Sequence, residues 1–198
     1  MILTQMVMPP EVRTTPAMVP DDLALVGRAK KDMSAFSALY ERYATQVYRY
    51  LLVRVGNVHD AQDLTSQTFM AAMKGLNTYQ GQSPFPAWLL GIARNKAADL
   101  FRRKHPDIEL DEAEEISDGG EGLDEVIDRQ IAVERIARKL QTISPDRAEA
   151  LSLRLFAGLE VPEIARMMDK NEAAVRMLVF RGLRDLQAQL NVTEETER

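Results

Sequence analysis

The chain has 198 residues, of which 45% are hydrophobic, with no cysteine and a formal net charge of -5. This length predicts one ordinary domain or two small ones, and the missing cysteine excludes disulfides, thiolate catalysis and cysteine-ligated zinc. Residues 1–20 have no basic region before their short apolar stretch and contain Pro9 and Pro10, so we expect a disordered tail and no signal peptide. No apolar run reaches the length of a membrane span, and we therefore expect a cytoplasmic protein.

The net charge conceals a strong segregation along the chain. Residues 21–104 contain 12 basic and 7 acidic residues, or +5, and residues 129–190 contain 11 basic and 8 acidic residues, or +3. Between them, residues 105–128 contain 11 acidic residues and no lysine or arginine. Such a segment buries too little apolar surface to fold, which predicts a solvated, flexible linker. An alternative is that the acidic segment mimics nucleic acid or keeps basic surfaces apart until a partner binds.

The first half of the chain has helical periodicity. Apolar residues recur at spacings of three and four, Gly56 marks a helix end, and no strand-like alternation of useful length is present. The turn-rich stretch "NTYQGQSPFP" interrupts the pattern before the last helix. These features predict a bundle of three or four helices, with helices over residues 21–31, 34–56, 59–76 and 87–104.

The second half begins with a helix predicted over about residues 124–141. Ser144 as N-cap and Pro145 at the first helical position then predict a new helix, which Gly158 ends. Two shorter helices joined by a tight turn follow within residues 160–186.

Stepping by 100° per residue divides the last helix into two faces. Asn171 is a suitable N-cap for this helix, and the preceding helix turns Ile164, Ala165 and Met168 inward. The inner face comprises Val175, Val179, Gly182, Leu183, Leu186 and Leu190. The outer face comprises Ala173, Met177, Phe180, Arg181 and Arg184. A packed inner face with basic, small and flexible outer side chains is what a recognition helix needs to enter a major groove.

The same pattern also fits a helical hairpin whose outer face is only solvated, because short helix-turn-helix patterns have low specificity. The outward Phe180 favours a DNA-binding face, since an aromatic ring among arginines can contact sugar or a thymine methyl group.

Three stretches together resemble the sigma-70 family, in particular the extracytoplasmic-function (ECF) sigma factors. They are "DAQDLTSQTF" at residues 60–69, "WLLGIARNKAADLFRRK" at 88–104 and "LSLRLFAGLEVPEIARMMDKNEAAVRMLVFRGLRDL" at 151–186. The resemblance covers about 150 residues in the family's order, with a linker in the expected place. It implies two all-α domains, with sigma region 2 at residues 21–104 and region 4 at 129–190, joined by the acidic linker 105–128. Residues 1–20 and 191–198 are then tails.

The first stretch resembles the family's segment for binding core RNA polymerase. Asp60, Asp63 and Gln67 share one helix face, from which they can pair with basic side chains of a partner helix, while Leu64 and Phe69 pack inside. Alternatively, the carboxylates only stabilise the N-terminal turns of their own helix.

The loop after this helix resembles the one that captures an unstacked base of the non-template strand. Amide and aromatic groups suit that role, because a flipped base offers hydrogen-bonding edges and a stacking face. Alternatively, the loop is an ordinary connector in which Phe85 caps the bundle. The candidate residues are Gln80, Gly81, Gln82, Ser83 and Phe85.

The second stretch resembles the helix that reads the minus-ten element. Its basic residues would bind phosphates, and Asn95 is the best candidate for a base-edge contact; a solvated basic helix end is the alternative. The candidates are Arg94, Asn95, Lys96, Asp99, Arg102 and Arg103.

The third stretch resembles the region that reads the minus-thirty-five element. It departs from the family in three places: Asp169 replaces glycine at the turn, Glu160 replaces the usual Ser or Thr cap, and Leu178 occupies a position that is often basic. Asp tolerates the left-handed conformation better than most residues, so we expect the turn to form. The candidate DNA contacts are Arg154, Lys170, Asn171, Ala173, Arg176, Met177, Phe180 and Arg181.

Three other interpretations fit parts of the sequence. A LuxR-type regulator explains residues 145–190 but gives no role to the first two stretches. A metal phosphohydrolase, suggested by the adjacent His59 and Asp60, needs more histidines than the two present. A helical adaptor would bind polymerase without selecting promoters. We therefore predict a non-enzymatic sigma factor without metal or cofactor, whose partners are core RNA polymerase, promoter DNA and, by resemblance, an anti-sigma factor, either free or membrane-bound.

Overall fold

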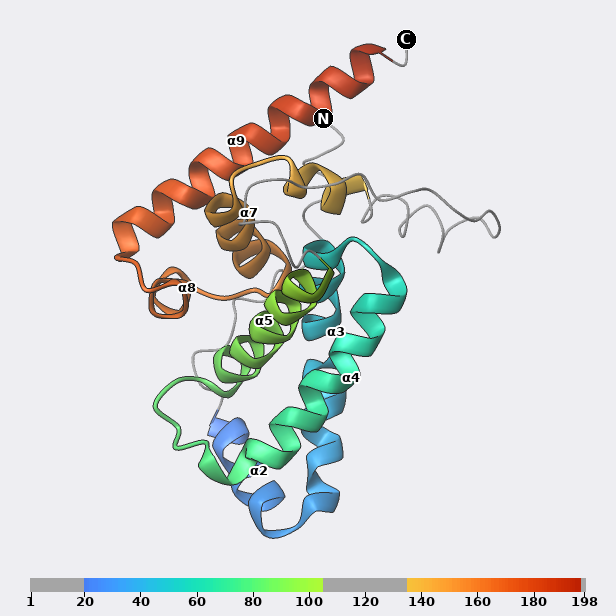
Figure 1. Cartoon of the computed structure of the whole chain (residues 1–198). Coiled ribbons are helices and arrows are strands. Elements are labelled where there is room, and N and C mark those ends of the chain that lie inside the picture. The colour runs from blue at the N-terminus through green and yellow to red at the C-terminus, as the bar shows by residue number, and fades with distance from the viewer. Residues whose placement is uncertain (1–19, 105–134, 197–198) are drawn as a thin grey trace.

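The computed structural model describes residues 20–104 and 135–196, and every regular element within these ranges is helical. The predicted N-terminal tail, the acidic linker and the first part of the helix predicted over residues 124–141 lie outside the described residues. Figure 1 shows the helices as two groups, with the C-terminal helices stacked on one end of the N-terminal bundle. The all-α fold class is confirmed.

The N-terminal half is a bundle of four helices, joined in part by short 3-10 turns. Apolar side chains line the inside of the bundle, and the helix ends lie within two residues of the predicted ones. The helices are α2 (Pro20–Lys31), α3 (Phe36–Val55), α4 (Val58–Gly75) and α5 (Phe85–Lys104), and the turns are η1 (Met33–Ala35) and η2 (Leu76–Thr78).

Local chemistry sets these helix ends. Gly56 has a φ of 69° and ends α3 in the left-handed conformation that glycine adopts without a Cβ clash. Asn57 then caps α4, its side-chain oxygen accepting a hydrogen bond from the Asp60 amide at 3.0 Å. Helix α5 begins at Phe85, two residues earlier than predicted. Pro86 does not prevent this start, because the first helical turn leaves its N–H groups without intrahelical partners.

Helix α2 is held to the bundle by a buried carboxylate. Asp22 is only 2% exposed; it pairs with Arg42 at 2.6 Å and accepts a short hydrogen bond from the Tyr43 hydroxyl. Burial, with Asp22 next to the ring hydroxyl, raises the pKa of Tyr43 above its ordinary value. The pairing satisfies both polar groups inside the core and fixes where α2 packs on α3.

The C-terminal half contains four helical segments. A short helical stretch over residues 135–141 precedes α7 (Pro145–Leu151), which continues as the π-helix η3 (Ser152–Phe156). The start of α7 at Pro145 is confirmed. The Ser144 side chain makes no capping hydrogen bond, whereas the Ser144 backbone carbonyl accepts a hydrogen bond from the Arg147 backbone amide at 2.9 Å. Gly158, with a φ of 66°, ends this segment as predicted. The last two helices are α8 (Val161–Met168) and α9 (Glu172–Thr196), and α9 extends beyond the predicted domain end at residue 190.

The turn between α8 and α9 forms with Asp169 in place of glycine. Asp169 has φ 53° and ψ 48°, which is the left-handed conformation expected for it. Asn171 caps α9 as predicted, since its side-chain oxygen accepts from the Ala174 amide at 2.8 Å. This turn sets the direction in which α9 leaves α8, and therefore which face of α9 is exposed.

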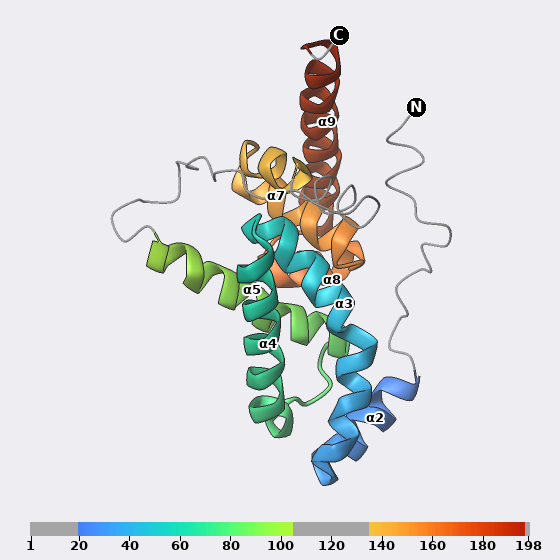
Figure 2. The ribbon, with the colours of Figure 1, turned by 90° about the vertical axis from the view of Figure 1, so that its right-hand side faces the viewer.

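The two halves pack together through two hydrophobic clusters, each with residues of both halves. Val53 of α3 lies in a cluster with Leu140, Leu151 and Leu186 of the C-terminal half. Other buried residues of α7, η3 and α8 join the core of the N-terminal bundle. Helix α8 contacts α5, and η3 contacts α3; Figure 2, turned by 90°, shows α8 next to α5. The sequence predicted two helical domains; their packing against each other was not predicted.

Candidate nucleic-acid interface

The outward face of α9 carries the side chains predicted to read DNA. Val175 is fully buried and Leu186 nearly so, and Val179 and Leu183 pack partly inside, which confirms the predicted inner face at these positions. The side chain of Leu190, also predicted on this face, lies outside the described residues. Phe180 is 63% exposed, which is unusual for an aromatic ring. The other predicted residues exposed beside it are Asn171, Ala173, Arg176, Met177 and Arg181.

Two basic side chains of this face form ion pairs near the protein surface. Arg176 pairs with Glu172 of its own helix at 2.6 Å, and Lys170 pairs with Asp146 of α7 at 2.9 Å. Exposed pairs of this kind contribute about 1 kcal/mol or less, so a phosphate can replace the carboxylate at low cost. Lys170, Met177 and Arg181 also line a shallow hollow with Ser144 and Arg147, between α7 and α9.

Arg154 has a different environment from the other predicted contacts. Its guanidinium donates to the Leu159 carbonyl at 2.9 Å and pairs with Glu160 at 2.8 Å. Glu160 is also the cap position of α8, and its amide donates to the Glu163 side chain at 2.8 Å. Arg154 therefore fixes the loop before α8, and Glu160 takes over the role of the usual Ser or Thr cap.

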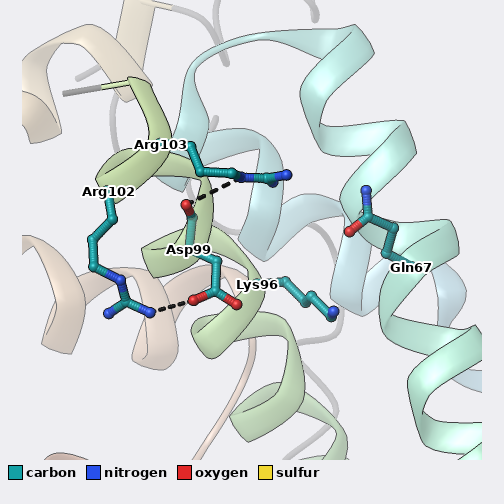
Figure 3. Close-up of a pocket in the computed structure, with 5 residues that line it drawn as sticks. All are labelled: Gln67, Lys96, Asp99, Arg102 and Arg103. Carbon is teal, nitrogen blue, oxygen red and sulfur yellow. Dashed lines mark hydrogen bonds and ion pairs between the residues drawn. The ribbon is translucent and has the colours of Figure 1, made fainter. Parts of the chain in front are cut away.

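The basic end of α5 faces α4 across a hollow (Figure 3). Arg102 forms a short ion pair with Asp99, and Arg103 donates to the Asp99 carbonyl at 3.3 Å. Lys96 and Gln67 complete the lining, so a residue predicted to bind polymerase borders the predicted DNA residues. Asn95 is exposed on the same helix.

The loop between η2 and α5 presents amides and keeps its aromatic rings inside. Tyr79 and Phe85 are buried, with ring centroids 5.6 Å apart. The prediction that Phe85 contributes a stacking surface is therefore not supported, because the ring closes the bundle as in the alternative reading. Gln80 and Gln82 are exposed and joined by a 3.0 Å hydrogen bond. Together with Gly81 and Ser83, they allow this loop to form hydrogen bonds with a partner, but not to stack an aromatic ring on it.

The predicted polymerase-binding face on α4 divides into outer and inner residues. Asp63 is exposed and accepts a hydrogen bond from the half-buried Gln67 at 2.6 Å. Asp60 lies near the helix start, where its amide is capped. Leu64 and Phe69 are buried, so they position the outer residues and do not contact a partner themselves.

A polar cluster between the two halves was missed at the sequence level. Glu149 of α7 is 6% exposed, and its carboxylate meets Tyr50, Arg54 and Arg94 of the N-terminal half. Burial first, and Glu149 second, raise the pKa of Tyr50 well above its ordinary value. A sequence signal was available: the end of α3, from Tyr50 to Val53, is apolar on every side, which is typical of a helix covered all round.

The described residues meet the requirements neither of a metal site nor of a membrane-spanning helix. No group of three or more histidine, aspartate or glutamate side chains gathers in a way that could bind a metal ion within residues 20–104 and 135–196. None of the helices described there combines the length and apolar character needed to cross a bilayer.

A helical bundle with an exposed acidic face, a basic helix and a helix-turn-helix are together typical of a DNA-binding protein of the transcription machinery. The chain matches the family models for Sigma-70 region 2 over residues 39–106 and Sigma-70 region 4 over residues 133–186. It belongs to the sigma-70 family, among the ECF sigma factors, which direct RNA polymerase to specific promoters.

Similar proteins include the ECF RNA polymerase sigma factor BldN of Streptomyces coelicolor, 38% identical over 169 residues. That alignment covers 83% of this chain and 64% of BldN, so the chain spans just under two thirds of that relative. The ECF RNA polymerase sigma-E factor of Escherichia coli K12 is 32% identical over 177 residues, with coverage of 81% and 90%. The fold also matches that of CnrH, solved in complex with the cytosolic domain of CnrY, with a TM-score of 0.68, 23% identity, and coverage of 86% and 97%.

Proposed function

We propose that the chain reads a promoter at two places, with α9 on the minus-thirty-five element and α5 with its preceding loop on the minus-ten element. The observation that carries this proposal is the composition of the exposed face of α9. Arg176, Phe180 and Arg181 face solvent on a helix whose other side is buried. The basic end of α5 supplies the second surface, where Lys96, Arg102 and Arg103 would bind backbone phosphates and Asn95 a base edge.

The proposed polymerase contact is the outer face of α4. Asp63 and Gln67 form a polar pair on an exposed surface, which suits a basic helix of the partner. The chain itself would supply no catalytic group; strand opening would be driven by binding energy for the unpaired strand, with Gln80 and Gln82 offering hydrogen bonds to an unstacked base. We place the protein in the cytoplasm, where polymerase and promoter DNA are found.

We infer that a negative regulator of the anti-sigma kind binds this chain. The support is the fold match with CnrH, which was solved with the cytosolic domain of another protein. No residue of the chain identifies this regulator.

The test is run-off transcription with core RNA polymerase of Escherichia coli on a library of promoter fragments. Transcripts with defined start sites, dependent on added protein, are expected. Absence of both polymerase binding and start-site selection would contradict the proposal, and polymerase binding without start-site selection would favour the helical adaptor.

A further inference from the structure

The loop between η2 and α5 is tied across by the side chain of its first residue, Tyr79. The Tyr79 hydroxyl donates a hydrogen bond to the Ser83 carbonyl at 2.5 Å, so the two ends of the stretch 79–83 are joined directly. The Tyr79 ring is only 5% exposed and packs against Phe85 and Trp88, with ring centroids 5.6 Å and 5.1 Å away. A buried ring has little freedom to move, and its hydroxyl therefore gives the loop one fixed point on which to close.

Helix α2 supports the same loop from the side. Lys30 Nζ donates to the Tyr79 carbonyl at 2.6 Å and lies 5.9 Å from the centre of the Tyr79 ring. Further along the loop, Gly81 has a φ of 72°, in the left-handed region that glycine adopts freely. Leu23 Cδ2 lies 3.8 Å from the point that a Cβ on Gly81 would occupy. Helix α2 therefore supports the loop at its start and near its middle.

The side chains that point away from these contacts are the two glutamines. Gln80 and Gln82 are exposed, and a 3.0 Å hydrogen bond joins their amides. An amide group can offer one donor and one acceptor to the edge of a base. Two amides can bind the same base only if the backbone between them keeps one conformation. A flexible loop would lose conformational freedom on binding, and that loss would lower the affinity.

We propose that Tyr79 and Lys30 are positioning residues, which hold the loop 80–83 in the conformation that receives an unstacked base. Neither residue needs to touch the base, because both act through the backbone that carries Gln80 and Gln82. The role in base binding rests on the proposed function, whereas the ordering of the loop rests only on the contacts of Tyr79 and Lys30.

The mobility of the loop in the free full-length chain tests the ordering directly. The chain has no cysteine, so Gln80→Cys provides a single site for a nitroxide spin label. Tyr79→Phe keeps the ring and removes the hydroxyl, and it should shorten the rotational correlation time of the label by about twofold. Lys30→Met should act in the same direction. Tyr40→Phe and Lys31→Met, at exposed positions of α3 and α2, are the matched controls and should leave the spectrum unchanged.

An unchanged spectrum in Tyr79→Phe would overturn the role of Tyr79, and an unchanged spectrum in Lys30→Met would overturn that of Lys30. If circular dichroism shows that Tyr79→Phe is unfolded, Lys30→Met decides for the loop as a whole, because Lys30 lies at an exposed position where a substitution is tolerated.

Binding of the minus-ten single strand by the chain assembled with core RNA polymerase tests what the ordered loop does. The probes are an oligonucleotide from a promoter found by run-off transcription and a series in which each base in turn is replaced by an abasic site. In the parent chain, the abasic site that weakens binding most marks the captured base. Tyr79→Phe should weaken binding of the intact strand by about fivefold, the effect of one hydrogen bond. It should change binding of the strand that lacks the captured base by less than about twofold, because the loop then has no base to receive.

Equal losses on both strands would overturn the positioning role, since they would indicate a general effect on the fold. A Gln80→Ala, Gln82→Ala chain gives an independent check: Tyr79→Phe should cost less than about twofold in this background, because it acts through the two amides. A more mobile label in Tyr79→Phe, in a parent chain that no abasic site weakens, would remove the proposed function of the loop and leave its ordering. A captured base in the parent chain with unchanged label spectra in both variants would remove the ordering and leave the proposed function.

Discussion

At the scale of single residues, Arg176 and Asp63 are expected to serve different partners. Arg176 is exposed on α9 and Asp63 on α4, so Arg176→Ala should weaken binding to the minus-thirty-five element by about 1–3 kcal/mol. Asp63→Ala should weaken binding to core polymerase and leave the DNA contact of the isolated chain unchanged. Filter binding to DNA and to polymerase separates the two effects, with Arg49→Ala, at an exposed position of α3, as control. Equal losses in both assays from either change would indicate misfolding.

Phe85 and Gln82 make a second pair at this scale, since both were predicted to contact DNA and only Gln82 is exposed. Phe85→Ala should reduce the free energy of unfolding by about 3–5 kcal/mol, because it leaves a cavity among Tyr43, Tyr79 and Trp88. Gln82→Ala should change stability by less than about 0.5 kcal/mol. Urea unfolding gives both values, and permanganate footprinting should show less promoter melting with Gln82→Ala. A stable Phe85→Ala protein with normal packing would contradict this assignment.

At the scale of helices, the contact between α7 and α9 depends on the absence of a side chain. A Cβ at Gly182 would lie 2.8 Å from Leu151 Cδ1 and 3.2 Å from Arg147 Cβ, within the cluster where α9 packs on α7. Gly182→Ala should therefore destabilise the protein by about 1–3 kcal/mol through overpacking, despite the better helix propensity of alanine. Gly27→Ala is the control, because no atom lies within 4 Å of its added Cβ, and it should stabilise α2 by up to about 1 kcal/mol. Thermal unfolding of both variants checks the opposite signs; stabilisation by both would mean that Leu151 moves aside freely.

Helix boundaries were predictable because they depend on local chemistry. Gly56, Pro145, Asp169 and Asn171 each act through their own backbone preference or cap, and each marks the helix end that the sequence predicted. The polar contacts of Arg154 could not be predicted, because its partners depend on where α8 begins.

The polar cluster around Glu149 could not be predicted from the sequence either. Tyr50 and Glu149 are 99 residues apart in sequence, and only tertiary packing brings them together. Burial decided the role of Phe85 in the same way, since periodicity identifies an apolar face but not how deep each ring lies. The exposed candidates on α9 were predicted well because one inner face determines the outer one.

At the scale of the whole molecule, two modest DNA-binding surfaces on one chain can give a specific promoter reader. Linking two sites raises the effective concentration of the second once the first is bound, provided that the geometry allows both to engage. In the structure the two halves pack against each other, so the interface between them contributes to the stability of the free chain.

Three buried tyrosines, one of them at this interface, predict how the folded chain responds to alkali. Burial raises the pKa of Tyr43, Tyr50 and Tyr79, whereas in the unfolded chain these groups ionise at about pH 10. Above that pH the unfolded state holds fewer protons than the folded state, so stability falls as pH rises, and the contribution is fully present below it.

We expect the urea midpoint to decrease from pH 9 to 11 more steeply than from pH 7 to 9. Tyr50→Phe should be less stable than the parent chain at pH 8, because Glu149 loses a hydrogen-bond donor, and should lose stability less steeply above pH 10. Tyr40→Phe, which removes a hydroxyl from an exposed ring, controls for the loss of a phenol. A Tyr50→Phe chain with the same alkaline slope as the parent would mean that Tyr50 is accessible to hydroxide, and therefore that the two halves separate readily without DNA.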